Sequence, residues 1–273
     1  MTDARDDPAT AGGPDPGPLL RDLASGGLTL VALSGGVDSA VVAQLAFRAL
    51  GRRAQAATLI GPAVSRAEVD RATAVAGAIG ISHLLVPVDP LTSPEYRANP
   101  SDRCYFCRQI EAAALRAWGS EHGIVRYVDG LHADDLGDDR PGIRAMDEAG
   151  FTHPLLAAGW RKSDVRRYAR SAGLPNADTP SDACLASRFA RGRSISADGL
   201  ARVARAEERL RARGFVRVRV RTDGDDARVE VDPGEVPRLL ASPLADAVVA
   251  ELRALGYVRV TLDERGYRPR AGA

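Results

Sequence analysis

The feature that most constrains the fold of this chain is the run Ser34-Gly35-Gly36-Val37-Asp38-Ser39, which separates an apolar stretch from a helix-like one. Residues 28–33 predict a buried strand, and residues 37–50 predict a helix. A strand, a Ser/Gly turn and a helix together form an anion cradle. Glycine lets the backbone approach a phosphate, and N–H groups at the helix N-terminus point towards it. Ser34 and Ser39 add hydroxyl donors.

Asp38 is a carboxylate in a loop that otherwise favours anions. A bound cation such as Mg2+, bridging phosphates, would explain it. A Walker-type phosphate loop is excluded, because it needs a lysine after its last glycine and the only lysine of the chain is Lys162. The alternative is a Ser/Gly turn that caps a helix, with Asp38 as a surface residue.

Composition limits the class of protein. The chain has 273 residues, of which 45% are hydrophobic, enough for one large domain or two of ordinary size. Its net charge of +1 argues against a broad nucleic-acid-binding surface. No apolar run is long enough to span a bilayer, and the Asp-, Pro- and Gly-rich start lacks the pattern of a signal peptide. We therefore expect a cytoplasmic protein without a membrane partner and a disordered tail at residues 1–18.

The N-terminal part of the chain alternates between strand and helix patterns. Strands are expected at 28–33, 54–60, 83–88 and 125–129, with helices between them at 37–50, 66–79 and 108–122. This rhythm predicts an α/β fold, a parallel sheet with helices on both faces. Ligands of such sheets bind at the carboxyl ends of the strands. Asp129 and Gly130, at the end of the last of these strands, are therefore candidates for the same crevice as the cradle.

The pattern changes in the second half of the chain. Residues 131–156 look loop-rich, and their dense charge is either solvated or part of a substrate or metal site. A helix is expected at 162–172, with Ser163 as a candidate N-cap. A further helix at 196–213 and strands at 215–221, 227–231 and 258–262 indicate a smaller α+β domain. We predict one domain at 19–191 and a second at 192–273.

The three cysteines are the candidate reactive groups. Cys104 and Cys107 form a Cys-x-x-Cys pair, and Cys184 lies far along the chain. In a reducing compartment such cysteines favour metal or catalytic roles. Three thiolates leave one metal position open, as a reactive centre requires, and a cubane iron–sulfur cluster so held would have one iron free for a ligand. The alternatives are a redox or persulfide system that uses Cys184, and a zinc site or three unconnected thiols.

Arginines alternate with valines along residues 216–221, at Arg217, Arg219 and Arg221. On a strand the valines face the core and the arginines share the other face, about 7 Å apart. Like charges at this spacing need anions or carboxylates nearby, and the guanidinium fork suits phosphate and carboxylate groups. The alternative is an edge strand with solvated arginines.

The Ser34–Ser39 run resembles the loop of the PP-loop ATP pyrophosphatase superfamily, in the form SGGxDS. With the other matching segments, the chain resembles over nearly its whole length the LarE family, the ATP-dependent sulfur transferases that build the nickel-pincer nucleotide cofactor. Those segments are Asn99–Arg108, Asp138–Gly142, Pro180–Arg188, Val218–Arg221 and Val260–Asp263. The resemblance implies an adenine nucleotide alpha hydrolase-like domain followed by the smaller α+β domain, which would serve substrate binding and oligomerisation, with hexamers expected.

The resemblance also implies an activity. The enzyme would adenylate the carboxylates of pyridinium-3,5-biscarboxylic acid mononucleotide, and a sulfur nucleophile would displace AMP to leave a thiocarboxylate. ATP would bind at Ser34, Gly35, Gly36, Val37, Asp38 and Ser39 with Asp129 and Gly130, and Asp38 would hold Mg2+. Substrate anions would bind at Ser187, Arg188, Arg219 and Arg221, near the acidic positions Glu207 and Glu230, which can also simply pair with the arginines.

The family has two sulfur sources. One branch gives up the sulfur of a single cysteine, here Cys184, and is left with dehydroalanine. The other resembles iron–sulfur tRNA thiolases, in which three cysteines hold a [4Fe-4S] cluster that an external sulfur donor would reload. The presence of Cys104 and Cys107 beside Cys184 favours the cluster branch.

Three other functions compete with this interpretation. A tRNA thiolase would share the loop and the cluster, but the near-zero net charge and the lack of zinc-knuckle cysteines argue against it. An amide-forming PP-loop synthetase would have no use for three convergent cysteines. A non-enzymatic regulator would bind ATP and use the cysteines for a structural zinc site.

Overall fold

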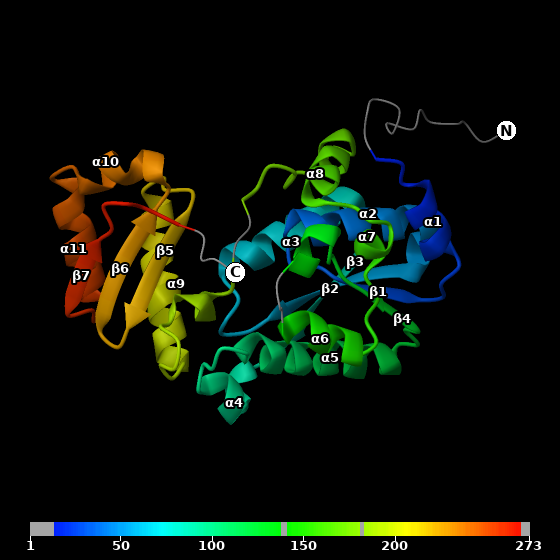
Figure 1. The fold of residues 1–273 in the computed structure, drawn as a ribbon, viewed down its shortest axis with the longest axis horizontal. Helices are drawn as coiled ribbons and strands as arrows, with labels where there is room; N and C mark the ends of the chain where they lie inside the picture. Colours follow the sequence, from blue (N-terminus) through cyan, green and yellow to red (C-terminus); the bar gives the residue numbers. More distant parts are fainter. Residues whose placement is uncertain (1–13, 138–140, 181–182, 269–273) are drawn as a thin grey trace. The chain divides into compact units, whose positions relative to one another are not determined.

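The structure is a computed structural model that describes residues 14–137, 141–180 and 183–268. Its contacts divide the chain into two compact units, Met1–Val88 with Cys104–Asp182 and Asp89–Arg103 with Ala183–Ala273 (Figure 1). The predictions for residues 1–13 and for 138–140 of the Asp-rich segment lie outside the described residues. Within the described ranges, every helix is too short or too polar to cross a membrane.

The first unit is built on a parallel sheet of four strands, which confirms the predicted α/β fold. The strands are β1 (Thr29–Ala32), β2 (Ala54–Ile60), β3 (Ser82–Pro87) and β4 (Arg126–Val128), in the order β3-β2-β1-β4. The chain adds β2 and β3 on one side of β1 and then returns to add β4 on the other. The carboxyl ends of β1 and β4 therefore flank a topological switch point, where sheets of this type bind ligands.

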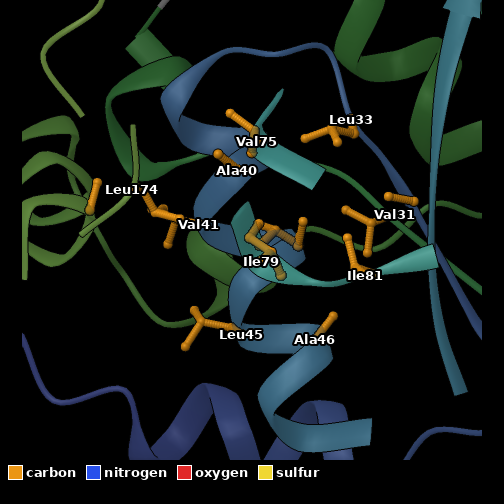
Figure 2. Packing of buried hydrophobic residues seen from close by; sticks show 14 of the residues in the cluster. Val31, Leu33, Ala40, Val41, Leu45, Ala46, Val75, Ile79, Ile81 and Leu174 are labelled. Atoms are coloured by element: carbon orange, nitrogen blue, oxygen red, sulfur yellow. The ribbon is translucent and has the colours of Figure 1, made fainter. Parts of the chain in front are cut away.

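Helices cover both faces of this sheet (Figure 1). On one face, α1 (Gly17–Ala24), α2 (Val37–Leu50), α3 (Arg66–Ile79) and α8 (Lys162–Ser171) bury a core with Val31 and Leu33 of the β1 segment (Figure 2). On the other face, α5 (Arg103–Glu121) and α6 (Pro141–Glu148) pack on Leu30, Ala57 and Val86. Neighbouring residues Leu30 and Val31 enter different cores because side chains alternate along a strand.

Four local predictions need correction. Helix α1 starts at Gly17, inside the predicted tail, because Leu19 and Leu23 bury an apolar face. Helix α5 starts at Arg103 rather than 108, so the Cys-x-x-Cys pair is helical. The segment 131–156, predicted to be loop-rich, contains η4 (Ala133–Gly137), α6 and most of α7 (Pro154–Ala157). The N-cap of α8 is Arg161, not Ser163, since the Asp164 carboxylate accepts a hydrogen bond from the Arg161 amide at 2.9 Å.

The second unit has a three-stranded mixed sheet with helices on its valine face, the smaller α+β unit predicted. Strand β6 (Asp226–Val231) lies between β5 (Val218–Asp223), which is antiparallel to it, and β7 (Arg259–Leu262), which is parallel. Three helices share one core with Val218, Val220, Val229 and Val231 of the sheet, namely α9 (Ala197–Ala212), α10 (Val236–Leu240) and α11 (Leu244–Ala254). The remaining short elements are η2 (Gly51–Arg53), η3 (Pro90–Thr92), α4 (Pro94–Arg97), η5 (Leu185–Arg188) and η6 (Pro233–Glu235).

The segment Asp89–Arg103 belongs to the second unit although it precedes α5 in the chain. The side-chain amide of Asn99, which is fully buried, donates to the Ala190 carbonyl at 2.7 Å. The amides of Gly192 and Ile195 donate to the carbonyls of Asn99 and Arg97 at 3.0 and 2.8 Å. These bonds join residues far apart in the chain, and the contact-based division falls before Ala183, ahead of the boundary predicted after residue 191.

Candidate nucleotide and sulfur site

The loop between β1 and α2 has the geometry of an anion cradle. Gly36 is the N-cap of α2 and has no side chain to cap the helix. The first amide groups of a helix left without a side-chain cap are suited to bind an anion. The Ser39 hydroxyl accepts from the Ser34 amide at 3.2 Å and donates to the Gly36 carbonyl at 3.1 Å. The two serine hydroxyls are 3.2 Å apart. The serines therefore brace the turn from inside.

Gly35 gives this loop a backbone conformation that favours glycine. Its φ is +79°, and a Cβ there would lie 2.9 Å from the Glu68 carbonyl oxygen and 3.0 Å from the Ala72 amide of α3. The Gly35 carbonyl accepts from the Asn176 side-chain amide at 2.9 Å and from Arg71 Nε at 3.2 Å. Asn176 itself is 2% exposed. A loop fixed on both sides in this way is preorganised for its ligand.

Gly130 brings the end of β4 against the start of α2. A Cβ on Gly130 would lie 2.6 Å from the Ser39 amide and 2.8 Å from the Asp38 carbonyl carbon. Only glycine permits this approach. The predicted nucleotide-site residues of the cradle and of the β4 end are thus brought together at the switch point.

The Asp38 carboxylate has a cationic partner from α8. Lys162 Nζ lies 2.7 Å from Oδ1 and 2.5 Å from Oδ2 of Asp38, and His132 Nε2 lies 3.7 Å from Oδ1. The Lys162 amide also donates to Asp134 at 2.8 Å. An ammonium group therefore lies beside the cradle. A divalent cation could replace it at Asp38, and a bound phosphate could become its new partner.

Sequence reasoning used Lys162 only to exclude a Walker-type loop and so missed its place in the site. The available signal was its identity, since every other Lys or Arg position of this chain is arginine. The ammonium group of lysine is a compact charge, whereas the guanidinium group of arginine is a planar fork, so the two suit different partners. No local pattern marks Asn176 in the same way, because its partner Gly35 is far away in sequence.

Asp129 is held by a histidine. His153 Nδ1 is 2.6 Å from Asp129 Oδ1, and His153 Nε2 is 2.8 Å from Asp147 Oδ1. Burial acts to lower the pKa of His153, but hydrogen bonds and charges of the two carboxylates outweigh it and raise that pKa above the ordinary value. Asp129 Oδ1 also accepts from the Leu131 amide at 3.1 Å, so the carboxylate is fixed at the end of β4.

Cys104 and Cys107 lie in the first turns of α5, and Cys184 precedes η5; none of these three described cysteines forms a disulfide. Residues three apart share a helix face, so the first two sulfurs lie on one side of α5. Cys107 Sγ donates to the Glu111 carboxylate at 3.3 Å. By contacts, the pair belongs to the first unit and Cys184 to the second.

The thiols fit a three-cysteine iron–sulfur cluster in kind and in number. No group of three or more His, Cys, Asp or Glu side chains in the described ranges is arranged to hold a metal ion.

Arginines donate to the backbone of the segment that carries Cys184, within the second unit. Arg188 Nη1 donates to the carbonyls of Ala183 at 2.5 Å and Cys184 at 3.2 Å. Arg103 donates to the Ala186 carbonyl at 2.9 Å, and Arg221 donates to the Ser187 carbonyl at 3.1 Å. Four of the five carbonyls between residues 183 and 187 thus accept a bond from a guanidinium group.

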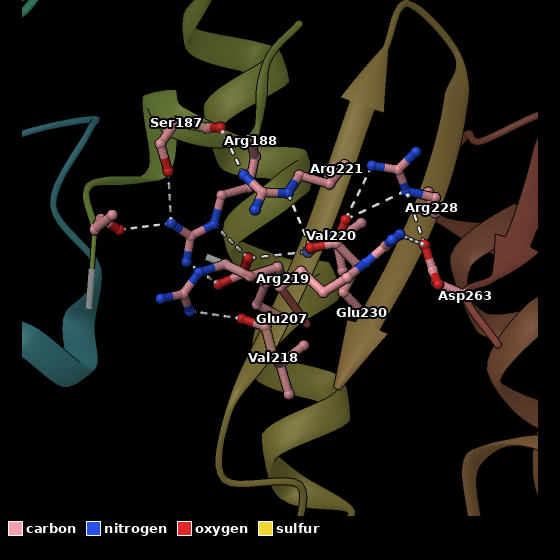
Figure 3. Close-up of polar contacts among 12 residues, drawn as sticks. Ser187, Arg188, Glu207, Val218, Arg219, Val220, Arg221, Arg228, Glu230 and Asp263 are labelled. Atoms are coloured by element: carbon pink, nitrogen blue, oxygen red, sulfur yellow. Dashed lines mark hydrogen bonds and ion pairs between the residues drawn. The ribbon is translucent and has the colours of Figure 1, made fainter. Parts of the chain in front are cut away.

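The acidic residues pair with the predicted substrate-binding arginines (Figure 3). Glu207, fully buried, accepts from Arg188 Nε at 2.6 Å, from Arg188 Nη2 at 3.0 Å and from the Val220 amide at 3.0 Å. Glu230 accepts from Arg221 at 3.1 Å. The carboxylates thereby neutralise an array that would otherwise repel itself.

The alternating strand is buried on both faces. Val218 and Val220 enter the core, and Arg219, 3% exposed, donates to its neighbour's carbonyl at 2.9 Å and lies with its guanidinium carbon 5.3 Å from the Tyr267 ring centre. Strand β5 does lie at the edge of its sheet, but the alternative of a solvated arginine is wrong for Arg219.

Comparisons with known proteins place the chain in a class. A family model described as NAD synthase matches residues 24–108, which contain the cradle and the Cys-x-x-Cys pair. The chain is 39% identical over 239 residues to an uncharacterized protein of Synechocystis sp., covering 88% of this chain and 89% of that protein. It is 33% identical over 250 residues to the pyridinium-3,5-bisthiocarboxylic acid mononucleotide synthase of Lactiplantibacillus plantarum, covering 91% of this chain and 89% of that protein.

The fold, the cradle and these matches define a PP-loop enzyme, a class that uses ATP. The similarity to the synthase extends through both units and includes the Cys184 segment in its span. The chain belongs to the LarE family, that of the pyridinium-3,5-bisthiocarboxylic acid mononucleotide synthases.

Proposed function

We propose that this protein is an ATP-dependent sulfur transferase that converts the carboxylates of pyridinium-3,5-biscarboxylic acid mononucleotide into thiocarboxylates. The observation that carries the proposal is the 33% identity to a synthase of that name over 91% of this chain. The reaction explains the need for ATP. A carboxylate is a poor acceptor because oxide would have to leave, whereas an acyl adenylate loses AMP readily.

In this proposal the cradle binds ATP. The amides at the start of α2, with the hydroxyls of Ser34 and Ser39, face the phosphates. Mg2+ binds at Asp38, and Lys162 moves from that carboxylate to the departing pyrophosphate. Charge stabilisation of the leaving groups provides most of the rate enhancement, so no strong base is required.

The substrate anions bind in the second unit, at Ser187, Arg219 and Arg221. Arg221 supports this role because one guanidinium nitrogen donates to the Ser187 carbonyl while Glu230 fixes its Nε. The same carboxylate accepts from Arg228 at 3.0 Å, which leaves the array with both signs of charge next to one another. A phosphate or carboxylate of the substrate would add to it through charge-assisted hydrogen bonds.

The sulfur comes from the cysteines. We propose that Cys104, Cys107 and Cys184 hold a [4Fe-4S] cluster, which when bound would offer one open iron for a transferable sulfide. In the alternative, Cys184 alone is the donor and is left as dehydroalanine. Iron and acid-labile sulfide after anaerobic purification, lost in serine variants of the three cysteines, support the cluster. Protein without iron after anaerobic reconstitution, and with one sulfur missing from Cys184 after turnover, supports the alternative.

Two variants separate the half-reactions. Asp38→Asn should lower pyrophosphate release about 10²- to 10³-fold, because the metal and phosphate charges lose their partner. Cys184→Ala should still release pyrophosphate but form no thiocarboxylate. Asp70→Asn is the matched control, since Asp70 forms an exposed pair with Arg66 on α3. Thiocarboxylate made by Cys184→Ala at the wild-type rate would rule out both sulfur sources.

A further inference from the structure

Arg188 is expected from the family resemblance to bind substrate, yet its guanidinium is used inside the protein. The residue is 1% exposed and is the largest of the fully buried side chains. Nε and Nη2 donate to Glu207, and Nη1 donates to the carbonyls of Ala183 and Cys184 and to the Ser187 hydroxyl at 3.0 Å. All three of its nitrogens therefore have partners on this chain.

The partners of Arg188 connect the Cys184 segment to a buried helix and strand of the second unit. Glu207 lies in the middle of α9, is fully buried, and accepts from the Val220 amide of β5 as well as from Arg211 at 2.9 Å. Through this carboxylate, Arg188 ties the backbone at residues 183–184 to a helix and a strand. A side chain whose own orientation is fixed by buried ionic bonds is suited to position a reactive group.

We propose that Arg188 is a positioning residue for Cys184 and not a substrate ligand. It holds the Cys184 peptide in one orientation, so that the thiol, or a cluster that the thiol binds, faces the activated carboxylate. The bond from the Ser187 amide to the Cys184 carbonyl, at 2.9 Å, closes the same turn from inside. This role rests on the proposed function, but the order that Arg188 imposes on the segment can be measured without any turnover.

The test compares Arg188→Gln and Arg188→Lys with Arg213→Gln. Arg213 is the matched control, because it also pairs with a glutamate of the second unit, Glu251, at 2.5 Å. The first readout is amide hydrogen exchange of the full-length protein, followed by mass spectrometry. The second is single-turnover kinetics with ATP, Mg2+ and the mononucleotide, which separates substrate half-saturation from the maximal rate.

If Arg188 positions Cys184, exchange should accelerate in the peptide that covers residues 183–189 while β5 and α11 remain protected. The maximal rate of thiocarboxylate formation should fall about 10²-fold in Arg188→Gln. Substrate half-saturation and pyrophosphate release should be retained. Arg188→Lys keeps the charge beside Glu207 but not the planar fork, so it should fold and show the same pattern more weakly.

Two results would overturn the proposal. One is unchanged exchange at residues 183–189 in both variants, which would show that the segment does not depend on Arg188. The other is a raised substrate half-saturation with an unchanged maximal rate, which would return Arg188 to the substrate site. If the wild-type protein forms no thiocarboxylate, the proposed function fails, and the exchange result alone decides whether Arg188 orders the segment.

Discussion

At the scale of single residues, two ion pairs set the character of the candidate site. Asp38 and Lys162 are each about a quarter exposed, so solvent and ligands can compete for both groups. Arg188 and Glu207 are buried, so replacing Glu207 would leave the Arg188 charge without that carboxylate, which typically costs about 3–5 kcal/mol. Replacing Arg188 would leave Glu207 paired with Arg211. The exposed pair is suited to change partners during turnover, and the buried pair is suited to remain.

His153 gives a pH dependence whose sign can be worked out. Its folded-state pKa is raised, so its contribution is fully present below the unfolded value of about 6.5 and is lost as pH rises through the folded value. The free energy of unfolding, measured with urea across this range, should therefore fall with pH in the wild type relative to His153→Gln.

His83 supplies the control of opposite sign. Burial lowers the pKa of His83, whose Nε2 lies 2.8 Å from the Thr58 hydroxyl. Its folded state therefore gains stability as pH rises towards about 6.5, and His83→Gln should remove that gain. Identical pH profiles for wild type and His153→Gln would contradict the assigned charge on His153.

At the scale of the element, the β1–α2 loop depends on one backbone conformation. Gly35→Ala should cost about 1–3 kcal/mol, because alanine is strained at positive φ and its Cβ would meet the backbone of α3. ATP affinity should fall with it, as followed by titration calorimetry. Gly77→Ala is the control, because Gly77 lies in α3 and a Cβ there would meet nothing within 4 Å. This substitution should raise the free energy of unfolding by about 0.5–1 kcal/mol. Equal effects of the two substitutions would argue against a special role of Gly35.

The elements around the cradle were predictable because local pattern decides them. Helices α2 and α3 and strand β2 have the predicted bounds. Their apolar periodicity and the N-caps Gly36 and Ser65 involve only residues within or next to each element, so they can be recognised in the sequence. Strand β5 starts at Val218 instead of Phe215, because its pairing with β6 begins at Val231. Register of this kind depends on a partner strand and is not visible in the alternating arginines and valines alone.

At the scale of the whole molecule, the features that could not be predicted depend on hydrogen bonds and packing between residues far apart in the chain. The strand-helix rhythm predicts a parallel sheet, and from it Gly130 is a candidate for the same crevice as the cradle. The pairing of β4 with β1 indeed brings Gly130 against the start of α2. The assignment of Asp89–Arg103 to the second unit could not be predicted, because it rests on bonds such as Asn99 to Ala190. The place of Lys162 beside Asp38 likewise depends on α8 packing against α2.

The two units divide the proposed chemistry between them. The first carries the cradle, Lys162 and the Cys-x-x-Cys pair, and the second carries the arginine array and Cys184. The residues proposed to bind ATP thus lie in the first unit, whereas the cysteines proposed to deliver sulfur are divided between the two units. Because adenylation precedes sulfur transfer in the proposed reaction, a variant of Cys184 should leave pyrophosphate release measurable.

The most direct test of the central claim is the mass of the small-molecule product. The wild-type protein, purified anaerobically, is incubated with ATP, Mg2+ and pyridinium-3,5-biscarboxylic acid mononucleotide, and the mononucleotide is then analysed by mass spectrometry. We predict replacement of carboxylate oxygen by sulfur, with one AMP and one pyrophosphate formed for each sulfur transferred. Pyrophosphate release with a mononucleotide of unchanged mass, or no pyrophosphate at all, would contradict the assignment of this protein as a sulfur transferase.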